Sequence, residues 1–153
     1  MSDTALPLES PKVRWDLSAL FSGPEDPKVE AAWIEAEAAV DAFAAKYRAR
    51  VSDLTSDELT KAITELETIY VTVAKPIGYA SLLHAADSAT PEIGAFYQSQ
   101  RERYTTLSVK LLFFELELQK AKDVDADAVG PYAHYVRTAR ALSPFRLSEP
   151  EEI

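Results

Sequence analysis

The chain has 153 residues and a formal net charge of −9, so its electrostatic field disfavours nucleic acid and anionic membrane surfaces as partners. The absence of cysteine excludes disulfides, thiolate metal sites and cysteine nucleophiles. With 47% hydrophobic residues and only 4 glycines, the composition favours an all-α globular domain. No apolar run approaches the ~20 residues of a membrane span, and the N-terminus lacks signal-peptide features, so we expect a cytoplasmic protein.

Residues 1–26 are predicted to form an extended N-terminal arm, because three prolines interrupt them. The arm also contains large apolar groups that are unfavourable in water. These are Trp15, Leu17, Leu20 and Phe21. We therefore expect the arm to dock on the helices.

The first predicted helix begins at Pro27, with Asp26 as its N-cap residue. Apolar residues then recur at alternating steps of four and three, which places them on one stripe. They are Val29, Trp33, Ala36, Val40, Phe43 and Tyr47. The pattern predicts a helix of about 22 residues with one buried face.

Thr55 and Glu58 have the spacing of a capping box and predict the start of a second helix. Leu54 and Leu59 stand where a hydrophobic staple needs them. The apolar stripe then continues through Ile63, Leu66, Ile69, Tyr70 and Val73.

Pro76 interrupts this second pattern, because an internal proline removes a backbone hydrogen bond and clashes with the preceding turn. The sequence therefore predicts a break or a kink at Lys75. A shorter apolar helix is expected over residues 77–86.

Thr90, Pro91 and Glu92 open what is predicted to be the longest helix, over residues 91–120. Its stripe has heptad-like spacing, with one polar position. The members are Ile93, Tyr97, Gln100, Tyr104, Leu107, Leu111, Phe114 and Leu118. Residues 111–118 are apolar on more than one face, so we expect them at the centre of the core.

A polar stretch over residues 122–127 precedes a last predicted helix over 128–141. Its apolar residues are Tyr132, Tyr135, Val136, Ala139 and Leu142. Ser148 and Glu151 then form a second capping box. The predicted organisation is an arm (1–26), a helical domain (27–147) and the truncated start of a further helix (148–153); a frayed acidic tail is the alternative for this last segment.

The two histidines, His84 and His134, are the first candidates for a metal site. They lie far apart in the sequence, and neither has a His or Glu at the offset that zinc or di-iron motifs require. We expect each to be a surface or half-buried helix residue.

Glu115 and Glu117 flank Leu116 in an apolar setting, where paired carboxylates can act as acid and base. Residues two apart on a helix point to different faces, so a structural role is favoured, with Glu115 paired to an Arg or Tyr. Three arginines near the C-terminus are interpreted as helix-dipole complements on a solvated or inter-domain face. They are Arg137, Arg140 and Arg146. No catalytic, cofactor-binding or metal-binding residue is predicted.

Several short motifs nevertheless occur in an order and spacing that resemble one family over nearly the whole chain, the oligoendopeptidase F type of thimet-like zinc metallopeptidases. The matching segments are Trp15-Asp16-Leu17-Ser18 with Leu20-Phe21, Tyr79-Ala80 with Leu82, Asp87-Ser88 before Thr90-Pro91-Glu92, Phe113-Phe114-Glu115-Leu116-Glu117-Leu118, and Leu147-Ser148-Glu149-Pro150-Glu151-Glu152. The resemblance implies a helical protein that encloses a channel and hydrolyses short oligopeptides.

In that family a histidine–glutamate–histidine zinc motif lies far downstream of these segments. The resemblance therefore implies that residues 1–153 form a non-catalytic N-terminal helical part without zinc. Its implied partners are a downstream catalytic domain in cis, which would hold the zinc, and the oligopeptide substrate of the parent enzyme.

The alternative is a free-standing helical module for protein–protein interaction or dimerisation. Amphipathic stripes are compatible with both hypotheses, because an apolar stripe indicates a buried helix face and does not identify a function. A reading frame that continues beyond Ile153 to a His-Glu-x-x-His motif would favour the peptidase. An isolated fragment is also expected to expose an apolar patch and to self-associate.

Overall fold

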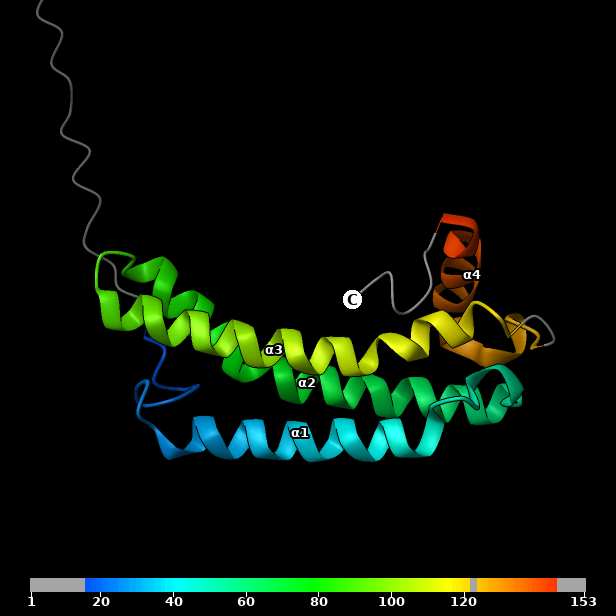
Figure 1. Cartoon of the computed structure of the whole chain (residues 1–153), viewed down its shortest axis with the longest axis horizontal. Helices are drawn as coiled ribbons and strands as arrows, with labels where there is room; N and C mark the ends of the chain where they lie inside the picture. The colour runs from blue at the N-terminus through cyan, green and yellow to red at the C-terminus, as the bar shows by residue number, and fades with distance from the viewer. Residues whose placement is uncertain (1–15, 122–123, 146–153) are drawn as a thin grey trace, which may run out of the picture.

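The computed structural model of this chain describes residues 16–121 and 124–145. Within these residues the chain contains helices and no strand, which confirms the all-α fold class. The order is α1 (Pro27–Tyr47), η1 (Val51–Asp53), α2 (Ser56–Ala86), α3 (Pro91–Leu118), η2 (Asp127–Tyr132), α4 (Ala133–Leu142) and η3 (Ser143–Phe145) (Figure 1). Trp15, Arg146 and the predicted capping box of Ser148 and Glu151 lie outside the described residues.

Helix α1 begins and ends close to the predicted positions. The Asp26 carboxylate accepts a hydrogen bond from the backbone N–H of Lys28 at 2.9 Å, which satisfies one of the free donors of the first turn. Every residue of the predicted stripe is buried, and Trp33 is completely covered. The local pattern therefore identified both the helix and its packed face.

Helix α2 starts at the predicted capping box, in which the Glu58 carboxylate accepts from the Thr55 N–H at 2.9 Å. Of the break or kink predicted at Lys75, the break is wrong, and so is the separate helix over 77–86, because α2 runs from Ser56 through Pro76 to Ala86 as one helix. Burying an apolar side chain such as Val73 contributes roughly 1.5–3 kcal/mol. Several such residues on both sides of Pro76 offset the ~3 kcal/mol cost of an internal proline.

The continuation makes α2, with 31 residues, longer than α3, with 28, so the prediction that the third helix is the longest is also wrong. The second half of α3 does form the centre of the core. Phe113, Phe114 and Leu118 are completely buried. This half of α3 meets several neighbours at once, because α3 contacts α1, α2, η1 and α4.

The last helix begins later than predicted. Residues 127–132 form the short helix η2, and α4 begins only at Ala133. Gly130 has φ 63° and ψ −124°, a conformation outside the helical region, and Pro131 follows it. Because proline disfavours helical geometry in the residue before it, the pair produces a kink within η2, and α4 begins only after it.

The three long helices lie side by side along the long axis of the molecule, and the chain reverses direction between them (Figure 1). Helix α4 stands across the end at which α1 finishes and α2 begins. At the opposite end, Phe21 is buried and its ring meets that of Tyr79 edge-on at 5.2 Å. Within the part of the chain that the structure describes, no helix is both long and apolar enough to cross a membrane.

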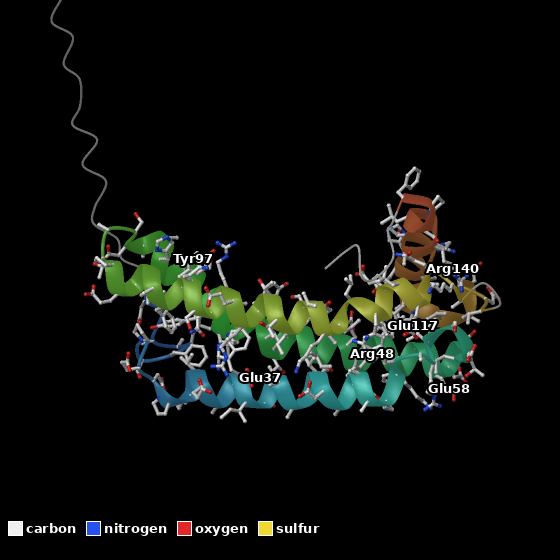
Figure 2. All side chains as sticks on the ribbon, viewed as in Figure 1. Glu37, Arg48, Glu58, Tyr97, Glu117 and Arg140 are labelled. Carbon is white, nitrogen blue, oxygen red and sulfur yellow. The ribbon has the colours of Figure 1, made fainter. Side chains whose placement is uncertain are left out.

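Polar contacts join α1 to α3. Arg103 pairs with Glu30 and Glu37, and its guanidinium lies 5.2 Å from the centre of the Trp33 ring. The Trp33 indole N–H donates to the side-chain oxygen of Gln100, which is buried. Figure 2 shows Glu37 on α1, on the side that faces α3. These contacts fix which faces of α1 and α3 meet.

Candidate functional site

A groove with a volume of ≈ 570 Å³ runs between α2 and α3. This is in the size range of small-molecule and peptide sites. Helix α2 contributes Tyr70, Ala74, Ile77, Gly78 and Ser81 to its lining, and α3 contributes Tyr97, Arg101, Tyr104 and Thr105. The lining therefore combines aromatic and aliphatic surface with a few polar groups.

Three tyrosines form the walls of this groove, although the sequence pattern assigns them to the buried stripes. Tyr70 is 42% exposed and Tyr104 is 38% exposed, while Tyr97 is half-buried. On α3, Tyr97 and Tyr104 lie one helical turn on either side of Gln100, whose side chain bonds to Trp33 of α1. Figure 2 shows Tyr97 near the beginning of α3. In the described residues, α1 covers only one side of the α2–α3 pair.

Arg101 is the only charged residue among those described along the groove. It stands one helical turn from both Tyr97 and Tyr104. Its guanidinium lies 5.6 Å from the centre of the Tyr97 ring, a cation–π distance. Within residues 16–121 and 124–145 no carboxylate pairs with it. Its N–H groups are therefore available to a ligand.

Burial and nearby groups both change the pKa of the Tyr70 hydroxyl. Burial raises the pKa of Tyr70 above its usual value of 10.0, and the negative charge of Glu115 and the neighbouring Tyr104 raise it further. The phenol consequently stays neutral at physiological pH and can donate a hydrogen bond. Glu115 is half-buried and lies near enough to Tyr70 to act on it electrostatically.

The histidines are not brought together. His84 stacks on Tyr97 with ring centres 5.0 Å apart, and its Nδ1 atom is buried without a hydrogen-bond partner in the described chain. His134 lies on α4, where it neighbours Thr138, at the other end of the molecule (Figure 1). Among the residues that the structure describes, no three His, Cys, Asp or Glu side chains are grouped to hold a metal.

Glu117 and the C-terminal arginines have structural contacts. The Glu117 carboxylate accepts from the backbone N–H groups of Ala49 and Val51. Arg137 pairs with Asp127 on the surface. Arg140 is half-buried and donates to the carbonyl oxygen of Ala121, so it anchors α4 to the end of α3 and does not belong to a solvated face.

The described fold and groove define an all-α protein with an open, tyrosine-walled groove that carries one unpaired cation. Comparisons with protein-family models, with curated proteins and with solved structures find no match. The sequence carries one signal for the groove. Three tyrosines stand on core stripes in place of aliphatic residues, and a tyrosine keeps its hydroxyl near water or a hydrogen-bond partner.

Proposed function

We propose that this chain is a non-catalytic helical domain that walls a channel for short oligopeptides, as in the oligoendopeptidase F type of peptidase. In this proposal its long antiparallel helices form a bundle, the N-terminal arm docks on that bundle, and a zinc-bearing catalytic domain in cis performs the hydrolysis. The chain itself contributes shape and contacts, and no metal ligand.

The open groove between α2 and α3 is the observation that carries this proposal. Tyrosine rings offer flat surface with little conformational entropy to lose, and their hydroxyls can bond to peptide groups. From Tyr97 to Tyr104 the α3 wall spans ~10 Å. An extended peptide rises about 3.3 Å per residue, so this length accommodates about three residues.

The test is a titration of the purified chain with an uncharged probe, acetyl-alanyl-alanyl-alanyl-phenylalanine amide, followed by two-dimensional NMR. We expect shifts at Tyr70, Tyr97 and Tyr104 and none at Ile34, which is exposed on α1. Peptide cleavage by the chain that a chelator abolishes would refute the non-catalytic role. An absence of groove shifts would refute the channel-wall role.

A second candidate function is a helical interaction or dimerisation module. It is favoured by the apolar surface at the end of α4, where Phe145 is 82% exposed and Leu142 is 43% exposed. Light scattering of the wild-type chain and of a Leu142→Ser, Phe145→Ser variant tests it. A dimer that the double substitution dissociates would favour this module over the peptidase domain.

A further inference from the structure

The positive charge of Arg101 in the groove between α2 and α3 indicates which part of a peptide the groove would bind. We propose that this groove receives the C-terminal end of an oligopeptide, with the Arg101 guanidinium binding the terminal carboxylate and the three tyrosines contacting the residues before it. This inference rests on the proposed function, because it names the part of the peptide that the groove would recognise.

The Arg101 guanidinium is planar and always charged, and it presents N–H groups in a fork that matches a carboxylate. Its central carbon lies over the Tyr97 ring, 5.6 Å from the ring centre. A cation–π contact holds the cation by electrostatic attraction and uses none of its N–H hydrogen bonds.

Some cations of the described surface have acidic partners, and Arg101 does not. Arg103 binds Glu30 and Glu37, Lys110 binds Asp41, and Lys46 binds Glu65. A chain with 25 acidic and 16 basic residues offers many carboxylates, yet none in the described residues pairs with Arg101. An external carboxylate is the complementary ligand.

The net charge of the chain favours one kind of carboxylate. A net charge of −9 repels a partner that carries several acidic groups. A short peptide without acidic side chains carries a single carboxylate, at its C-terminus, and meets the least repulsion. The remaining lining is uncharged, so the side chains before that carboxylate can be apolar or aromatic.

The contacts of Arg101 indicate the direction of the bound peptide. The guanidinium lies over Tyr97, which stacks on His84 near the end of α2. Tyr104 lies one turn beyond Arg101 in the other direction, and Tyr70 of α2 lies near Tyr104. The peptide would therefore place its carboxylate near Tyr97 and extend its preceding residues toward Tyr104 and Tyr70.

The experiment compares three probes on the 153-residue chain, monitored through the Arg101 side-chain N–H signal and the tyrosine signals in NMR spectra. The first is acetyl-alanyl-alanyl-alanyl-phenylalanine with a free carboxylate, and the second is its C-terminal amide. The third, acetyl-aspartyl-alanyl-alanyl-phenylalanine amide, moves the same charge to a side chain. We expect the free acid to bind about tenfold or more tightly than either amide, as a charge-assisted hydrogen bond would give.

Arg101→Gln should weaken binding of the free acid by a similar factor and remove the difference in affinity between the free acid and the uncharged amide. Arg137→Gln is the matched control, because it removes the same charge from a surface ion pair outside the groove. It should change neither affinity appreciably. Arg101→Lys keeps the charge but loses the fork, so its affinity should fall between wild type and Arg101→Gln.

Equal binding of the free acid and its amide at the tyrosines would overturn the carboxylate inference while the channel-wall proposal stands. Tighter binding of the aspartyl amide than of the free acid would overturn the choice of the terminal carboxylate. If no probe shifts the groove signals, both proposals fail.

Discussion

The Glu117 carboxylate, near the end of α3, accepts a hydrogen bond from the backbone N–H of Ala49 at 2.7 Å across 68 positions of sequence. Its second oxygen accepts from the Val51 N–H at 3.1 Å. Among the residues that the structure describes, Ala49, with φ 63°, is the one non-glycine residue with a positive φ. One side chain of α3 thus satisfies two donors of the turn between α1 and α2 and holds that turn in its conformation. Figure 2 shows Glu117 near the end of α3.

Replacing Glu117 with glutamine should lower the free energy of unfolding by about 1–2 kcal/mol, because one charged acceptor becomes an amide donor facing a backbone N–H. Urea denaturation followed by circular dichroism measures this change. Glu102→Gln is the control on the same helix, since Glu102 is exposed and bonds only locally to Gln98. Equal effects of the two substitutions would contradict the role assigned to Glu117.

Ala49 and Gly130 have the same positive φ, so glycine should give a more stable fold than alanine at both positions. Ala49→Gly is expected to raise the free energy of unfolding by up to about 1 kcal/mol, because glycine adopts φ 63° without strain. Gly130→Ala, also at φ 63°, should lower it by about 1–3 kcal/mol. Thermal and urea unfolding measure both changes.

Gly94→Ala is the control for this pair, because Gly94 lies in α3 and an added Cβ there would meet open space. It should stabilise the chain by about 0.5–1 kcal/mol through helix propensity. A stabilising effect of Gly130→Ala would show that the turn before α4 relaxes easily.

The buried pair of Trp33 and Gln100 should show strong coupling in a double-mutant cycle. Gln100→Leu leaves the indole N–H without an acceptor, which costs about 1–3 kcal/mol. In a Trp33→Phe background that donor is absent, so the same substitution should cost about 1–3 kcal/mol less. Additive effects in urea unfolding would argue against the hydrogen bond.

Stability should fall in acid, partly through the capping box of α2. Hydrogen bonds from Thr55 lower the pKa of Glu58 below its usual 4.5. A carboxyl with a lowered folded-state pKa stabilises the fold above its unfolded pKa, and that contribution is lost as the pH falls through the folded value. The slope of unfolding free energy against pH below 4.5 should therefore be shallower in Glu58→Gln than in wild type.

Thr55→Ala removes the other half of the capping box and should lower the free energy of unfolding by about 1 kcal/mol at neutral pH. Its acid slope should also become shallower, because Glu58 then loses the hydroxyl donor that favours its charged form. Unchanged acid slopes in both variants would place the acid sensitivity at other carboxyls, such as Glu30.

Helix starts were predictable because their signals are local. Asp26 and Thr55 each bond to a backbone group two or three residues ahead, so the residues that decide the start lie within one turn. The stripe of α1 was equally predictable, since a single face of that helix packs against its neighbours. The same reasoning wrongly predicted that the helix can end at Pro76, where burial on both sides of the proline outweighs the local cost.

The groove was not predictable in the same way. The spacing of Tyr97 and Tyr104 is that of core positions, and only the placement of α1 on one side of α2 and α3 leaves those rings at a surface. The availability of Arg101 depends equally on where the acidic side chains of other helices lie.

The sequence by itself determined the all-α class, the first turns of α1 and α2 and the residues of the α1 stripe, because caps and helical periodicity act over a few residues. The tertiary structure decided that α2 crosses Pro76 and that three tyrosines face a groove. Both outcomes depend on which side of each helix is covered by its neighbours. Contacts between residues far apart in the chain determine this, so the local sequence does not.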